Sequence, residues 1–152
     1  MFHVCSRNID IKEDMDNTFW KLAYRYCAKE FFETNSLLGK AIQGEAIGPG
    51  IQGNIYQLRD VDLRVFDVYD VKAGKYVSPE ERMKVIGTHF QHVPIIHKSL
   101  IISRDLDTML LIADGVSLLN DVRREGLVYK CNEKPVSFKT VSNDYLVNGA
   151  KL

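Results

Sequence analysis

Apolar residues recur at three- and four-residue spacing between positions 16 and 35, which predicts an amphipathic helix over this range. Asp16 or Asn17 is suited to cap its start, and Gly39 follows shortly after its end. The apolar stripe comprises Phe19, Trp20, Leu22, Ala23, Tyr26, Cys27 and Phe31. A stripe of this width predicts that the helix packs one side against a core.

From residue 40 onward, short apolar runs separated by turn residues predict mainly strands. With an earlier strand over 2–10 counted as the first, the expected strands continue with 40–48, 54–58, 63–71, 75–78, 92–96, 126–131 and 136–141. The glycine-rich link GPGIQG separates the second and third of these strands, and KAGK is the expected turn of a hairpin.

Helical signals return later in the chain, in the runs 78–86, 104–120 and 142–147. In the first of these runs Ser78 is the expected N-cap, Pro79 occupies the first turn and Glu81 completes an S-x-x-E capping box. The second run is interrupted at Gly115. The element order predicts an α+β fold of mostly antiparallel sheets with helices packed on them.

Length and composition fit one ordinary globular domain, since the chain has 152 residues of which 45% are hydrophobic and 26% charged. Twenty basic and twenty acidic residues cancel, so no global field attracts a polyanion and any such contact needs a local patch. The three cysteines lack metal-site spacing and favour a reducing compartment. With neither a signal-peptide pattern nor a membrane-length apolar run, we expect a cytoplasmic protein without a membrane partner.

Charged residues inside strand-like runs are the candidates for chemistry: Arg7, Glu45, Asp67, Glu125 and Lys139. Each of them taken alone is more often an ordinary structural or solvated charge. If they converge, carboxylates for Mg²⁺ and cations for phosphoryl oxygens would share one site, which suits a metal-bound phosphate.

Glycines flank two of these acids, because Gly44 precedes Glu45 and Gly126 follows Glu125. A glycine within a strand often marks the close approach of a ligand or of another backbone. A bulge or bend of the strand is the alternative explanation.

Five segments, taken in order, resemble the later motifs of ATP-dependent RNA ligases, which belong to the covalent nucleotidyltransferase superfamily. The segments are CSRN (5–8), IQGEAIGPGIQGN (42–54), LRVFDVYDV (63–71), REGLVYK (124–130) and SFKTVSNDYLV (137–147). The chain is most similar to the nick-sealing and RNA-editing branch. The resemblance covers nearly the whole chain and implies part of the ATP-grasp-like nucleotidyltransferase domain of DNA and RNA ligases.

The resemblance implies nucleotide-binding roles for four residues. It implies that Glu45 hydrogen-bonds the ribose and that Phe66 stacks on the adenine. Lys139 resembles the lysine that contacts the α-phosphate, and Lys130 is similarly implied in nucleotide binding. The implied cofactors are ATP, bound as AMP after the first step, and Mg²⁺.

The resemblance also implies roles in metal binding and in RNA binding. Glu125 is similar to the acid that supports the divalent metal, and Asp67 is a second implied metal contact. Arg7 resembles the arginine that contacts the phosphate of the nucleotide or the RNA end. The implied partners are RNA ends or a nicked duplex.

Two departures from the family pattern qualify what the resemblance implies. The fifth motif is often K-x-K, and Ser137 stands at its first position here. In addition, these residues contain no K-x-[DE]-G, the motif whose lysine attacks ATP in the family. We therefore expect residues 1–152 to be the C-terminal portion of the nucleotidyltransferase domain of an RNA ligase, unable to adenylylate itself alone. A catalytically dead remnant that binds nucleotide or RNA ends, and one half of a split ligase completed by an N-terminal segment in trans, remain open.

Overall fold

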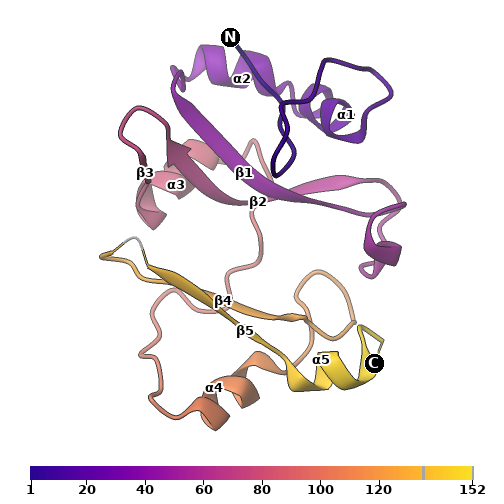
Figure 1. Cartoon of the computed structure of the whole chain (residues 1–152), viewed down its shortest axis with the longest axis vertical. Coiled ribbons are helices and arrows are strands. Elements are labelled where there is room, and N and C mark those ends of the chain that lie inside the picture. Colours follow the sequence, from indigo (N-terminus) through magenta and orange to yellow (C-terminus); the bar gives the residue numbers. More distant parts are fainter. Residues whose placement is uncertain (135, 152) are drawn as a thin grey trace.

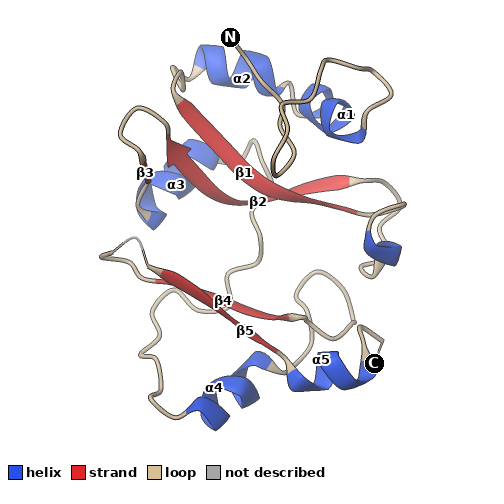
Figure 2. Cartoon of the chain, viewed as in Figure 1, coloured by secondary structure: helices blue, strands red, loops and turns tan. Residues whose placement is uncertain are grey.

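The computed structural model describes residues 1–134 and 136–151, and Figures 1 and 2 show its helices and strands. Its helices are α1 (Thr18–Arg25), α2 (Ala28–Thr34), α3 (Pro79–Ile86), α4 (Leu106–Ala113) and α5 (Asn143–Asn148), with a single 3-10 turn η1 (Gln52–Asn54). Its strands are β1 (Lys40–Ile47), β2 (Asp62–Asp70), β3 (Lys75–Tyr76), β4 (Gly126–Lys130) and β5 (Ser137–Val141). The predicted α+β arrangement is confirmed.

Two separate antiparallel sheets form the framework, one ordered β1-β2-β3 and the other a β4-β5 hairpin. In Figure 1, α1 and α2 lie above the larger sheet, while the β4-β5 hairpin lies below it with α4 and α5 further below. The larger sheet therefore has one surface toward the hairpin and one toward its own helices.

The main core lies on the helix side of the larger sheet. Its buried residues are Ala28, Val65, Val68, Ile86 and Phe90. Val65, Val68 and Ile86 have no exposed surface, so each stabilises the fold by about 1.5–3 kcal/mol of hydrophobic transfer free energy.

A β-bulge in β2 decides which of its side chains face the core. Gln43 pairs with Asp67 and the next residue, Gly44, pairs with Val65, so Phe66 is an extra residue in β2. The bulge places Val65 and Val68 on the same face, which is the core face. Asp67 consequently lies on the opposite face, toward the hairpin.

The first predicted helix is interrupted at Cys27, which adopts a left-handed backbone with φ of 42°. The preceding residue explains the break, because the Tyr26 hydroxyl hydrogen-bonds Asp62 at 2.5 Å and its carbonyl lies 2.5 Å from His89 Nε2. These contacts to other elements fix a turn that the helical spacing alone does not show. Asn17 caps α1 as predicted, accepting from the amide of Phe19.

Three predicted strands are wrong. Residues 54–58 continue from the end of η1 through a turn into a loop, because Asn54 has a positive φ and its side chain hydrogen-bonds both backbone groups of Leu58. Residues 92–96 make a single bridge, between His92 and Val65. Residues 2–10 form only an isolated bridge between Cys5 and Asp10.

Several helix boundaries confirm the capping signals, and one helix is shorter than predicted. Ser78 accepts from the amide of Glu81 at the start of α3, whereas the Glu81 carboxylate lies 3.1 Å from Lys40 Nζ. Helix α4 ends at Ala113 because Arg124 donates hydrogen bonds to carbonyls at that end. Helix α5 and both closing strands are confirmed. No helix among the described residues is long and apolar enough to cross a membrane.

Candidate functional site

Lys130, the last residue of β4, connects the hairpin to the larger sheet. Its Nζ lies 2.5 Å from Oδ2 of Asp67, donates to the Phe66 carbonyl at 2.9 Å and lies 5.5 Å from the centre of the Phe66 ring. The bulge thus presents two consecutive residues of β2 to a single amine. Burial lowers the pKa of Lys130, and the charge of Asp67 opposes this shift.

Asp67 also contacts a second cation, since Arg82 Nη1 of α3 lies 3.3 Å from its Oδ1. Arg82 is only 7% exposed, so this ion pair is largely removed from water. The ring of His92 is close enough for Asp67, Arg82 and Lys130 to affect its pKa, which burial lowers.

The pleat of the hairpin places Lys139 on the same side as Lys130. Val128 pairs directly with Lys139 in the hairpin, and Val128 and Lys130 are two residues apart on β4, so all three share a face. Tyr129 and Thr140 are buried on the other face. Since Lys130 contacts β2, this shared face is the one turned toward the larger sheet.

On the larger sheet, the same register argument places Glu45. Glu45 pairs with Arg64, and both lie on the face opposite Val65, which is the face that carries Asp67. We call these two facing sets of side chains the inter-sheet surface. It comprises Glu45, Phe66 and Asp67 from the larger sheet, and Val128, Lys130 and Lys139 from the hairpin.

Glu125 lies beside Lys139, with which it forms an ion pair whose two side chains are each 48% exposed. Its carbonyl accepts from the amide of Ser142 at 2.8 Å, which fixes its backbone. The half-buried Tyr56 is affected by both acids, because burial and then the charges of Glu45 and Glu125 raise the pKa of its phenol.

The flanking glycines are explained by the approach of other strands. A Cβ on Gly44 would lie 2.9 Å from the Arg64 carbonyl oxygen, and one on Gly126 would lie 2.0 Å from that of Thr140. Gly44 is also the β1 residue at the bulge. The close approach that the sequence predicted is thus made by a backbone of this chain.

Arg7 is the candidate that the structure leaves apart from the others. It is exposed in the turn between the bridged residues Cys5 and Asp10. Within residues 1–134 and 136–151, its side chain has neither an ion pair nor a hydrogen bond to another candidate. Its role at a phosphate stays a prediction.

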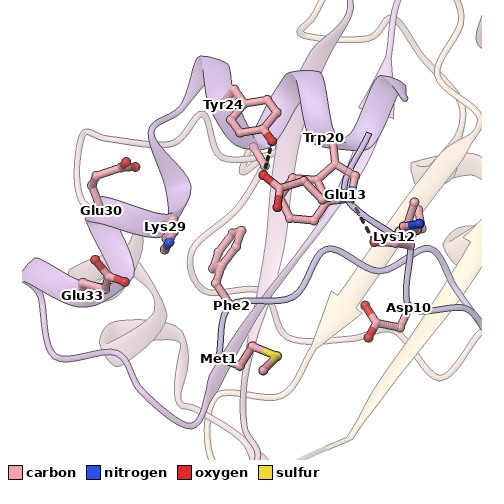
Figure 3. A pocket seen from close by; sticks show the side chains of 12 residues that line it. Met1, Phe2, Asp10, Lys12, Glu13, Trp20, Tyr24, Lys29, Glu30 and Glu33 are labelled. Atoms are coloured by element: carbon pink, nitrogen blue, oxygen red, sulfur yellow. Dashed lines mark hydrogen bonds between the residues drawn. The ribbon is translucent and has the colours of Figure 1, made fainter. Parts of the chain in front are cut away.

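A cavity of about 600 Å³ lies elsewhere, on the helix side of the larger sheet. Figure 3 shows Phe2 and Trp20 within it and the acids Glu30 and Glu33 at its edge. Apart from these, its lining includes Met1, Asp10, Ile11, Lys12, Glu13, Ala23, Tyr24 and Lys29. None of the residues that the sequence singled out for chemistry lines this cavity.

A metal held by protein groups alone has no site among the described residues, where no three His, Cys, Asp or Glu side chains are grouped. Magnesium usually binds one or two carboxylates together with phosphate oxygens and water. Glu125 is half exposed beside a lysine and fits this requirement, whereas both oxygens of Asp67 already contact cations.

Four further residues of this region were not predicted from the sequence: Tyr56, Arg82, His92 and Val128. Arg82 had a detectable signal, because it lies four residues before the buried Ile86 and therefore on the apolar side of α3. His92 had none, since its position depends on how the segment after α3 returns to β2.

Comparison with known proteins identifies the family. The profile of the RNA ligase family, described as "RNA ligase", matches residues 1–141. No curated protein matches the sequence.

Solved structures of Naegleria gruberi RNA ligase are also similar to the chain. A lysine-to-alanine variant with ATP and manganese is 37% identical with a TM-score of 0.89, over 95% of this chain and 44% of that one. A second such variant with ATP and manganese is 36% identical with a TM-score of 0.90, over 97% and 44%. A glutamate-to-alanine variant with AMP and manganese is 36% identical with a TM-score of 0.89, over 95% of this chain and 44% of that one.

The chain thus spans less than half the length of the Naegleria chains that it matches. Their nucleotidyltransferase fold agrees with the α+β class predicted from the element order. The family profile covers the segments that carry the motif resemblance up to residue 141. The chain belongs to the RNA ligase family.

Proposed function

We propose that this chain binds ATP with a divalent metal and forms part of an enzyme that joins RNA 5′-phosphate and 3′-hydroxyl ends. The observation that carries the proposal is the inter-sheet surface. Its larger-sheet side carries Glu45 and Phe66, and its hairpin side carries Lys130 and Lys139. Family membership supports it, as do the Naegleria relatives with ATP or AMP and manganese.

Phe66 and Val128 would contact the base in this proposal. Phe66 is half-buried on β2, and Val128 is 61% exposed on the facing hairpin strand. An aromatic ring on one surface and an apolar side chain on the other suit a planar heterocycle. Glu45 is exposed on the same surface as Phe66, and no side chain within residues 1–134 and 136–151 pairs with its carboxylate, whose oxygens can accept from ribose hydroxyls.

Lys139 and Glu125 would act at the α-phosphate. Transfer of a nucleotidyl group depends on positioning and on neutralising charge at the phosphoryl oxygens. Lys139 supplies a cation, and Glu125 would hold Mg²⁺ together with oxygens of the nucleotide. Because their ion pair is half exposed, it can open at small cost when a phosphate takes the place of Glu125 beside Lys139.

The attacking amine is proposed to come from outside these 152 residues, because none of their lysines has the K-x-[DE]-G context. In the first step a lysine amine attacks the α-phosphorus, a P–N bond forms, and the bond to the leaving pyrophosphate breaks. AMP then passes to the RNA 5′-phosphate before the 3′-hydroxyl displaces it. A catalytically dead remnant would bind nucleotide without supporting any of these steps.

Calorimetric titration of the chain with ATP in the presence of MgCl₂ tests the binding claim. We expect saturable binding and competition by AMP, because AMP retains the base, ribose and α-phosphate. Absence of binding at millimolar ATP, with the chain shown to be folded by circular dichroism, would refute the proposal.

Incubation with ATP labelled at the α-phosphate tests the source of the amine. We expect the chain alone to stay unlabelled, and an acid-labile protein–AMP adduct would show that one of its own lysines attacks. Supplying a nicked duplex with a pre-adenylylated 5′ end bypasses this step. Joining of that nick would show that the chain supports the final step, whereas ATP binding without joining would favour a binding remnant.

A further inference from the structure

We propose that Arg82 is a positioning residue that holds Lys130 against Phe66 through the carboxylate of Asp67. The proposal deepens the proposed function and rests on it for its effect on ATP. Arg82 belongs to α3, outside both of the surfaces that would contact the nucleotide. Its influence on binding would therefore be transmitted through the two intervening side chains.

The carboxylate of Asp67 serves both cations at once, with one oxygen for each. Oδ1 lies 3.3 Å from Arg82 Nη1, and Oδ2 lies 2.5 Å from Lys130 Nζ. A carboxylate fixed at one oxygen cannot rotate freely about its terminal torsion. Arg82 thereby orients the second oxygen toward the hairpin.

Lys130 transmits this orientation to the inter-sheet surface. Its amine also donates to the Phe66 carbonyl at 2.9 Å and lies 5.5 Å from the ring centroid. The three residues therefore link α3, β2 and β4 in one series of polar contacts. The series ends at the aromatic ring and sets the separation of the two surfaces at that point.

Burial makes this series stronger than a surface ion pair. The side chains of Arg82 and Asp67 are 9% and 17% exposed, whereas those of the exposed pair Lys84 and Glu80 are 74% and 80% exposed. Charges removed from water interact more strongly and are screened less by salt. Removing one member of such a group alters the others more than removing a surface charge does.

Arg82→Met is the informative substitution, because methionine retains the bulk of the side chain and the Asp67 carboxylate keeps Lys130 as its remaining partner, so no buried charge is left alone. We expect the variant to fold and to bind ATP about fivefold more weakly than the wild type. Lys84→Met, on the exposed side of the same helix, is the matched control and leaves ATP affinity unchanged.

The double variant with Asp67→Asn separates positioning from direct contact. If Arg82 acts through Asp67, Arg82→Met adds nothing to the affinity lost with Asp67→Asn alone. Additive losses would mean that Arg82 contacts ATP itself and would overturn the proposal. Unchanged affinity in a folded Arg82→Met variant would overturn it as well.

A denaturation cycle with Arg82→Met and Lys130→Met tests the linkage without ATP. We expect their effects on the free energy of unfolding to be coupled. We expect this coupling to vanish when Asp67 is already replaced by Asn. Additive effects would overturn the proposal. If the wild type fails to bind ATP, the proposed function falls, while this cycle still decides whether Arg82 holds Lys130. If Arg82→Met does not fold, Arg82→Gln, which also removes the charge, replaces it in both cycles.

Discussion

Nζ of Lys130 lies 2.5 Å from Oδ2 of Asp67, so an ion pair joins the last residue of the hairpin strand β4 to the middle of β2 in the other sheet. A second polar link joins the connections beside them, because Asn120 Nδ2, between α4 and β4, donates to the carbonyl of Tyr56, between β1 and β2, at 2.8 Å. Side chains therefore determine how the candidate nucleotide-binding residues of the two sheets are placed relative to each other.

Removing either member of the Glu125–Lys139 ion pair should affect binding far more than stability. Because the pair is half exposed, we expect Glu125→Gln and Lys139→Met each to change the free energy of unfolding by less than about 1 kcal/mol. We expect each to weaken Mg·ATP binding at least about tenfold, since charge-assisted contacts to phosphate are lost. Calorimetry and urea denaturation measure the two effects. Unchanged affinity in both variants would remove these residues from the site.

Gly126→Ala should strongly destabilise the hairpin, because the added Cβ would lie 2.0 Å from the Thr140 carbonyl oxygen. We expect a loss of about 3 kcal/mol in the free energy of unfolding. Gly74→Ala is the matched control, since Gly74 also has a positive φ but no atom within 4 Å of the added Cβ. Denaturant titration should show a loss of about 1 kcal/mol there. Equal losses in the two variants would contradict the close approach at Gly126.

Ser142→Ala should cost more than an ordinary N-cap substitution. Ser142 is fully buried, and its hydroxyl donates to Asp114 Oδ1 at 2.6 Å while accepting from the amide of Tyr145. We expect a loss of about 2 kcal/mol, compared with about 1 kcal/mol for Ser78→Ala at the exposed start of α3. Thermal and urea denaturation of the two variants compare them directly. If Ser78→Ala proves the more damaging, the hydroxyl of Ser142 is not an essential buried donor.

The Tyr26 phenol should make stability fall at alkaline pH. Burial, followed by its hydrogen bond to Asp62, raises the pKa of Tyr26 from 10.0 to about 12. The unfolded phenol ionises first, so this contribution is complete below pH 10 and is lost as the pH rises toward 12. Tyr26→Phe should flatten the decline measured by urea denaturation across this range. The same slope in wild type and variant would assign the alkaline loss to other groups.

The strands and the ion pair of the hairpin could be predicted because their determinants are local. Two short runs separated by a polar turn must pair antiparallel, and this brings Glu125 and Lys139 together. Ser78 and Asn17 likewise begin helices through contacts with residues two or three positions away. Such contacts join residues that are close in the sequence, so a local sequence pattern is enough to predict them.

The remaining features depend on contacts between distant segments. The break at Cys27 follows from hydrogen bonds of Tyr26 to Asp62 and His89, and helical spacing carries no information about either partner. The second cation on Asp67 similarly depends on how α3 docks against β2. The role of Asp67 as a counter-ion consequently required the fold.

Because Phe66 is an extra residue in β2, the number of residues in this strand, as well as their types, determines which side chains lie on each face of the sheet. Exchanging that side chain would leave the count intact, so Val65 and Val68 would stay in the interior. Deleting one residue there would reverse the faces of the side chains in one half of the strand. Either a core valine would then face solvent or the Asp67 carboxylate would face the apolar core. Variation in length among related ligases should therefore fall in the connecting loops, while this short stretch keeps a fixed number of residues.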